Sequence, residues 1–271
     1  MDDIESLREE IRRLRKSLAE LTPSLDALLR LRGFRIYKRE PADDLLLPSE
    51  EFIDGFYEMM KRYSFRLFLR DVIKHQRNFR MENVTRYATA EVTGDYVEYL
   101  RGIGIIEEIS GGFRLALGPI KSFGETLEWF LAEIFRREFE TEAIWGIRFK
   151  RPKVGGDYDL ISKVDGAILY MEIKSSPPKQ IYQTEISAFL ERVSDLSAEI
   201  SIFFVDTELR MKDKIVAMFE EEFGRFDPPP KVVRMEKELF QIRDKIFIIN
   251  AKDSISANIE KVLSRYFRRN R

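Results

Sequence analysis

Apolar side chains in the first 21 positions recur at alternating spacings of three and four residues. They form three heptads with isoleucine or leucine at both core positions: Ile4, Leu7, Ile11, Leu14, Leu18 and Leu21. This pattern is typical of a coiled coil, so we expect a homodimer through this segment. Three heptads are marginal alone, and the alternative is one amphipathic helix folded back on its own domain. Thr22-Pro23 ends the pattern, and a short helix is expected over 24–31.

A second unit follows a linker that contains proline and aspartate, residues 40–48. The pattern predicts a long helix over 61–80, a short helix over 83–88 and a third helix that Thr93 caps. Two short strands around a turn at 110–112 complete the unit. Three helices followed by a hairpin resemble a winged helix-turn-helix.

The long predicted helix is strongly basic. Its only acid is Asp71, and it carries seven bases: Lys61, Arg62, Arg66, Arg70, Lys74, Arg77 and Arg80. That excess suits contact with phosphates, and we assign nucleic-acid binding to Arg66, Arg70 and Lys74. The third helix carries Asp95 and Glu98, which repel phosphates, so we do not expect it to read a DNA sequence. The alternative is a solvated basic helix on a winged helix that contacts protein.

From Gly124 onward, helical and strand patterns alternate. Helices are expected over 125–139, 179–196, 211–223 and 255–269, and strands over 143–149, 158–164, 167–174, 200–205 and 245–249. The alternation predicts an α/β or α+β domain over 119–271. A winged-helix-like domain over 50–118 precedes it, and a coiled-coil segment with its linker occupies 1–49.

Composition excludes several kinds of chemistry. The chain has no cysteine and one histidine, His75, which excludes thiol catalysis and argues against zinc sites and Ser-His-Asp triads. Its 46 basic and 47 acidic residues leave a net charge of −1, so any nucleic-acid contact needs local patches. The charged fraction of 34% and only four glutamines fit a thermophile. No apolar run reaches the ~18 residues of a membrane helix and no secretory signal is present, so we expect a cytoplasmic protein.

One predicted hairpin places charges opposite each other. A two-residue turn at Asp165-Gly166 sets Asp159 directly opposite Glu172 and Asp157 opposite Lys174, all on one face. Carboxylates ~5 Å apart repel, so either one is protonated or a divalent cation lies between them. Mg²⁺ or Mn²⁺ would suit such oxygen ligands, and Lys174 could position or help to deprotonate a water. The alternatives are a turn of odd length, which turns Asp159 away, and a merely solvated charged face.

This stretch resembles a known family. Gly156-Asp157-Tyr158-Asp159-Leu160, followed by Met171-Glu172-Ile173-Lys174, is similar to the PD-(D/E)XK nuclease superfamily of restriction-endonuclease-like fold, in the variant of archaeal Holliday-junction resolvases. The resemblance implies a mixed central sheet flanked by helices. It also implies that Asp159, Glu172 and the backbone of Ile173 bind Mg²⁺ and that Lys174 assists the attacking water. The proline of the motif is missing, since Tyr158 precedes Asp159.

The resemblance extends to neighbouring elements. It implies an accessory carboxylate on the preceding helix, Glu128 with Glu125 as the alternate, and a glutamine on the following helix, Gln183 or Gln180. Further phosphate contacts are expected from Arg148, Lys150, Arg151 and Lys153. The basic run 261–271 is either a phosphate contact or a solvated surface.

These features lead to three functional hypotheses. The first is a Mg²⁺- or Mn²⁺-dependent DNA endonuclease whose other parts hold substrate and pair two active sites. The second is a catalytically idle nucleic-acid-binding or regulatory protein that uses the nuclease fold as a scaffold. The third, least favoured because of Asp95 and Glu98, is a transcription regulator built on the winged helix.

Overall fold

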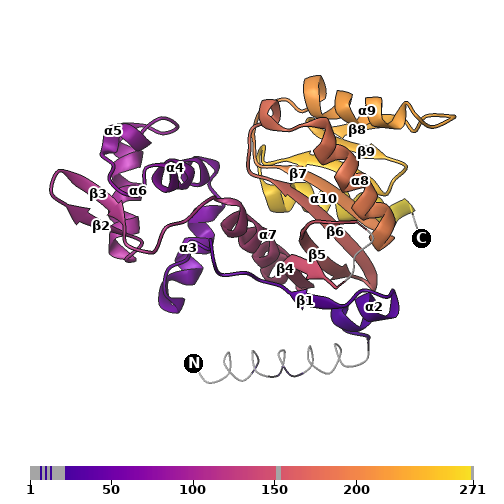
Figure 1. Cartoon of the computed structure of the whole chain (residues 1–271), viewed down its shortest axis with the longest axis horizontal. Coiled ribbons are helices and arrows are strands. Elements are labelled where there is room, and N and C mark those ends of the chain that lie inside the picture. Colours follow the sequence, from indigo (N-terminus) through magenta and orange to yellow (C-terminus); the bar gives the residue numbers. More distant parts are fainter. Residues whose placement is uncertain (1–6, 8–9, 11–12, 14–21, 151–153, 270–271) are drawn as a thin grey trace.

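The computed structural model describes residues 7, 10, 13, 22–150 and 154–269, and Figure 1 shows a helical module beside a larger α/β body. The predicted coiled coil lies outside the described residues apart from residues 7, 10 and 13, and the side chain of Leu7 is exposed. No helix in the described part of the chain is long and apolar enough to cross a membrane.

The α/β body is built on a mixed sheet. In spatial order its eight described strands are β1 (Ile36–Lys38), β4 (Glu142–Phe149), β5 (Tyr158–Val164), β6 (Ala167–Lys174), β7 (Ile200–Val205), β10 (Ile246–Asn250), β9 (Leu239–Ile242) and β8 (Val232–Glu236). The β6–β7 and β7–β10 pairs are parallel and the other pairs are antiparallel. The mixed sheet expected from the sequence is therefore present.

Helices cover both faces of the sheet. The helices α7 (Gly124–Glu138) and α10 (Ile255–Arg269) pack on one face, whereas α2 (Leu25–Leu31), α8 (Gln183–Leu196) and α9 (Ala217–Phe223) pack on the other. Strand β6 supplies both cores, with Met171 facing α7 and Tyr170 facing α8. Because both faces are buried, the central strands are almost continuously apolar.

Three strands were not predicted from the sequence: β1, β8 and β9. They have three to five residues each, too few for the alternation of apolar and polar residues to stand out. Strand β1 pairs with β4, and Leu25 and Leu29 of α2 are buried against the sheet. Both elements belong to the segment assigned above to 1–49, so residues 25–38 of that segment pack on the α/β body.

The three helices and the hairpin of the helical module follow in the predicted order: α4 (Tyr63–Lys74), α5 (Met81–Val84), α6 (Ala90–Gly102), β2 (Ile106–Ile109) and β3 (Gly112–Leu115). A further helix that was not predicted, α3 (Ile53–Met60), precedes them. A Cβ on Gly112 would lie 2.5 Å from the carbonyl oxygen of Phe79, so the contact of β3 with residue 79 requires glycine. A winged helix that binds DNA stays a prediction.

The cap of α6 differs from the prediction. The helix begins four residues before its expected start and is capped by a different threonine: Thr89 Oγ1 accepts a hydrogen bond from Val92 N at 3.3 Å. Thr93 is buried within the first turn, where its hydroxyl donates to the carbonyl oxygen of Thr89 at 2.8 Å. Both threonines suit a cap by sequence, and packing of the first turn selects the earlier one.

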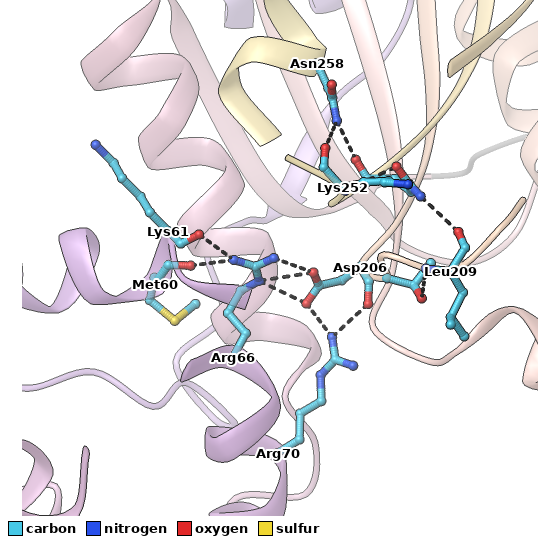
Figure 2. Close-up of polar contacts among 10 residues, drawn as sticks. Met60, Lys61, Arg66, Arg70, Asp206, Leu209, Lys252 and Asn258 are labelled. Carbon is cyan, nitrogen blue, oxygen red and sulfur yellow. Dashed lines mark hydrogen bonds and ion pairs between the residues drawn. The ribbon is translucent and has the colours of Figure 1, made fainter. Parts of the chain in front are cut away.

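A buried ion pair joins the helical module to the sheet (Figure 2). Arg66 on α4 is 1% exposed and donates from Nε at 3.1 Å and from Nη2 at 2.8 Å to the carboxylate of Asp206, which follows β7. Its Nη1 donates to the carbonyl oxygens of Met60 and Lys61 at 2.7 and 3.1 Å. The prediction that Arg66 contacts nucleic acid is therefore wrong, because its guanidinium group is buried and inaccessible to a ligand.

Candidate active site

The predicted hairpin register is confirmed along most of β5 and β6. Val164 pairs with Ala167 and Leu160 with Met171. The turn residues Asp165 and Gly166 have φ values of 49° and 79°, the left-handed backbone of a two-residue hairpin turn. This register brings Asp159 to the β6 segment that carries Glu172 and Lys174.

The open end of the hairpin departs from the predicted pattern. Asp159 Oδ2 accepts a hydrogen bond from the backbone N–H of Ile173 at 2.7 Å. Asp157 precedes the first residue of β5, so the ladder does not hold it opposite Lys174. Instead its two carboxylate oxygens accept hydrogen bonds from Arg148 Nε and Nη2 at 2.6 and 2.8 Å. The prediction that Asp157 lies with Lys174 on one face is wrong for this reason.

Glu172 is surrounded by donors. The side chain is 3% exposed, and Lys174 Nζ donates to its Oε1 at 2.9 Å. Its Oε2 accepts from Arg192 Nη1 at 2.9 Å and from the hydroxyl of Tyr170. Two cations therefore compensate the charge of Glu172. This differs from the two alternatives expected from the sequence, a protonated carboxylate or a metal ion.

The sequence analysis missed three members of this cluster: Tyr170, Glu185 and Arg192. Lys174 Nζ lies 2.9 Å from Glu185 Oε1, so this ammonium group bridges two carboxylates. Glu185 and Arg192 are seven residues apart on α8, which puts both on one face of the helix. Two features of the sequence could have predicted these residues: the spacing of Glu185 and Arg192, and the position of Tyr170 two residues before Glu172 on the same side of the strand.

Glu128 joins the acidic cluster from the other side of the sheet. It lies on α7, and its Oε2 is 3.6 Å from the position that a Cβ would take on Gly146 of β4. Burial raises the pKa of Glu128 well above its usual range, and repulsion from Asp159 and Glu125 raises it further. Burial and then repulsion from Glu172 likewise raise the pKa of Asp159. Burial and the proximity of the acids therefore both favour the protonated form of these two carboxyl groups.

Lys174 remains a cation at neutral pH. Burial acts to lower its pKa, but attraction to Glu172 and Asp159 outweighs burial, and the pKa of Lys174 is raised. A raised pKa disfavours a neutral amine that takes a proton from water. The ammonium group is suited instead to donate hydrogen bonds to a water or a phosphate oxygen.

The donors fit a hard divalent cation in chemistry. Asp159 and Glu128 offer oxygen ligands; burial, followed by repulsion between the acids, raises their pKa values, and a bound Mg²⁺ or Mn²⁺ would favour their carboxylate forms. Within the described ranges, no group of three or more His, Asp or Glu side chains is arranged to hold a metal ion. Glu172 Oε1 accepts one hydrogen bond, from Lys174, and so keeps a lone pair that could bind a cation, whereas Oε2 accepts two. The carbonyl of Ile173 stays a predicted ligand.

The residues predicted to bind nucleic acid are scattered. Lys74 and Lys150 are exposed, Arg148 is paired with Asp157, and Arg151 and Lys153 lie outside the described residues. Arg70 donates to the carboxylate of Asp206. The proposed role of Gln183 near the carboxylates is wrong, since its amide nitrogen donates to the Met218 carbonyl and to Glu222 at 2.9 and 3.0 Å. Gln183 therefore joins α8 to α9 through these hydrogen bonds.

We expect Glu128→Gln to raise thermal stability near neutral pH. The pKa of Glu128 is raised in the folded state, so folded protein binds more protons than unfolded protein above the usual pKa of about 4.3. Stability therefore falls as pH rises through the folded pKa, and glutamine removes this loss. The expected gain at pH 8 is roughly 2–4 °C in Tm, vanishing near pH 4.

Differential scanning calorimetry between pH 4 and 8 measures this effect. The matched control is Glu191→Gln, at an exposed position of α8, which should leave the pH dependence of Tm unchanged. Mg²⁺ should raise the Tm of the wild type more than that of Glu128→Gln. Equal pH dependence in wild type and Glu128→Gln would show that this carboxyl is not under electrostatic strain.

Comparison with known proteins supports the fold. No family model matches the sequence, and no curated protein matches it significantly. The structure of Can2 from Sulfobacillus thermosulfidooxidans in complex with cyclic tetra-adenylate is 13% identical, with a TM-score of 0.50 over 90% of this chain and 60% of that chain. Protein VC1899 from Vibrio cholerae is also 13% identical, with a TM-score of 0.51 over 89% of this chain and 60% of that chain.

The chain thus spans about three fifths of the length of each of these two structures. At 13% identity the likeness concerns the fold alone. It supports the arrangement of a mixed sheet flanked by helices that is described above.

Proposed function

We propose that the protein is a divalent-metal-dependent endonuclease that hydrolyses phosphodiester bonds in DNA. The observation that carries the proposal is the meeting of Asp159, Glu172 and Lys174 at the open end of one hairpin, with Glu128 reaching them from α7. Carboxylates beside a charged lysine are the groups that metal-assisted phosphodiester hydrolysis needs. A shared fold does not establish turnover, so the activity itself needs a test.

In this proposal Asp159, Glu172 and the carbonyl of Ile173 hold Mg²⁺ or Mn²⁺, with Glu128 as an accessory ligand. The metal would supply Lewis acidity and a water of lowered pKa. Lys174 positions the water and donates to the phosphate, and Glu172 and Glu185 fix its ammonium group. Arg192 balances the charge of Glu172 and holds its carboxylate in place.

The remaining predictions belong to the same proposal. The segments 1–49, 50–118 and 119–271 would serve as dimerising coil, winged-helix-like substrate holder and nuclease domain. The protein would act as a cytoplasmic homodimer, with one active site for each strand of a duplex. The Can2 structure contains a nucleotide ligand, which is consistent with a nucleic-acid partner here.

One observation favours the second candidate, a catalytically idle binding protein. Both oxygens of Glu172 already accept hydrogen bonds from Tyr170, Lys174 and Arg192. A carboxylate satisfied in this way does not need a metal ion. This arrangement would preserve the fold as a scaffold without turnover.

Cleavage of labelled duplex, single-stranded, flap and four-way-junction DNA separates the two candidates. We expect cutting in Mg²⁺ or Mn²⁺, none in EDTA, and loss of at least ~100-fold in Asp159→Asn. Lys231→Ala, at an exposed position just before β8, is the control and should cut normally. Absence of cutting on every substrate, with DNA bound equally by all variants, would support the idle binding protein.

A further inference from the structure

A cleft of about 480 Å³ opens between the helical module and the end of the sheet that carries the candidate active site. One wall comes from α4 and the segment after α5, which contribute Lys74, Arg86 and Tyr87. The other wall consists of residues 121–123 and 175–177 together with Gln180. The cleft is therefore a feature of the tertiary structure, formed by four separate segments of the chain.

The cleft adjoins the candidate active site through the chain itself. Ser175 directly follows Lys174, and residues 121–123 directly precede α7, the helix that carries Glu128. A polymer that lies in the cleft is consequently led toward the hairpin end that bears Asp159 and Lys174.

The charge of the lining is strongly positive. Asp71 is the single acid among the lining residues, against four bases: Arg70, Lys74, Arg86 and Lys121. Lys74 and Arg86 are exposed and form no ion pair within the described ranges, while Lys121 is 84% exposed and lies 3.8 Å from Asp44. Arg70 is already paired with Asp206. Three cations thus remain available to an incoming anion, in a protein whose net charge is −1.

An exposed aromatic ring lies among these cations. Tyr87 is 44% exposed, and the guanidinium of Arg86 is 5.2 Å from its ring centroid. Cationic grooves with an accessible aromatic ring bind single-stranded nucleic acids, because the cations follow the backbone while unpaired bases stack on the ring. A smooth basic surface without such a ring would favour a duplex backbone equally well.

We propose that this cleft binds the sugar-phosphate backbone of a single nucleic-acid strand and guides it into the candidate active site. Lys74, Arg86 and Lys121 contact successive phosphates, and Tyr87 stacks on an unpaired base. The proposal rests on the proposed function for the fate of the strand, but the binding itself does not require cleavage.

The test measures binding of a fluorescein-labelled 20-nucleotide single strand in EDTA as a function of salt. We expect the triple variant Lys74→Gln, Arg86→Gln and Lys121→Gln to bind at least ~10-fold more weakly. The slope of the logarithm of its binding constant against the logarithm of the salt concentration should be about 2 units shallower. Tyr87→Ala should weaken binding of the single strand without changing the slope. A duplex of the same sequence should be less affected by the tyrosine substitution.

A matched triple variant controls for the loss of three charges. Lys231→Gln, Arg243→Gln and Lys245→Gln remove three exposed cations at the opposite end of the sheet and should leave affinity and slope unchanged. Inorganic phosphate and AMP as competitors distinguish a polymer site from a site for a small phosphate, and displacement by either at micromolar concentration would overturn the strand assignment.

The outcomes separate this proposal from the nuclease proposal. Equal affinity and slope in wild type and in the cleft variant, with normal cutting by the wild type, would overturn the cleft and leave the nuclease intact. Loss of binding in the cleft variant without any cutting by the wild type would support the cleft and refute the nuclease. Asp159→Asn should bind the strand as the wild type does.

Discussion

Asp206→Ala is expected to destabilise the protein by about 3–5 kcal/mol, because it leaves the buried guanidinium of Arg66 without its carboxylate. Arg66 and Asp206 are 1% and 0% exposed, and water cannot replace the lost partner without opening the contact between α4 and the sheet. Arg70 loses the same partner (Figure 2). Urea unfolding followed by circular dichroism gives the midpoint and the m-value.

Two further variants define what Asp206 contributes. Asp43→Ala removes an exposed carboxylate, 3.1 Å from Lys38, and should leave the urea midpoint nearly unchanged. The double variant Arg66→Met with Asp206→Leu should lose less than the sum of the single changes, since it buries no unpaired charge. A loss below ~1 kcal/mol in Asp206→Ala would contradict a buried, unhydrated pair.

Lys174→Ala is expected to lower the single-turnover cleavage rate by roughly 10²–10³-fold, because the variant loses a positioned donor to the water and phosphate. The proposed metal ligands Asp159 and Glu172 remain, so Mg²⁺ should still shift the Tm. Lys174→Arg should restore little activity, because a planar fork cannot occupy the position between Glu172 and Glu185 as a compact ammonium group does.

The pH profile checks the charge state of this lysine. Because attraction to Glu172 outweighs burial and raises the pKa of Lys174, the wild-type rate should show no loss from lysine deprotonation below about pH 10. Lys231→Ala again provides the matched control. A cleavage rate within ~3-fold of wild type in Lys174→Ala would remove this lysine from the proposed chemistry.

The order of apolar, polar and turn residues along the chain was sufficient to predict the most regular elements. Ile200–Val205 and Ile255–Arg269 have the predicted bounds, and the two-residue turn at 165–166 fixed the hairpin register. These features depend on local periodicity and turn chemistry, which a sequence displays directly. That register also brought Asp159 to the β6 segment that carries Glu172 and Lys174.

Other features arise only where distant segments meet. The buried state of Arg66 depends on Asp206, which lies 140 residues further along the chain, and nothing near Arg66 distinguishes it from the exposed Lys74. Arg192 reaches Glu172 only because α8 folds back over β6. The sequence by itself determined the hairpin and its register, which bring Asp159 to the segment that carries Glu172 and Lys174. The tertiary structure decided which charges compensate these groups, because burial and the pairing of charges are properties of packed neighbours.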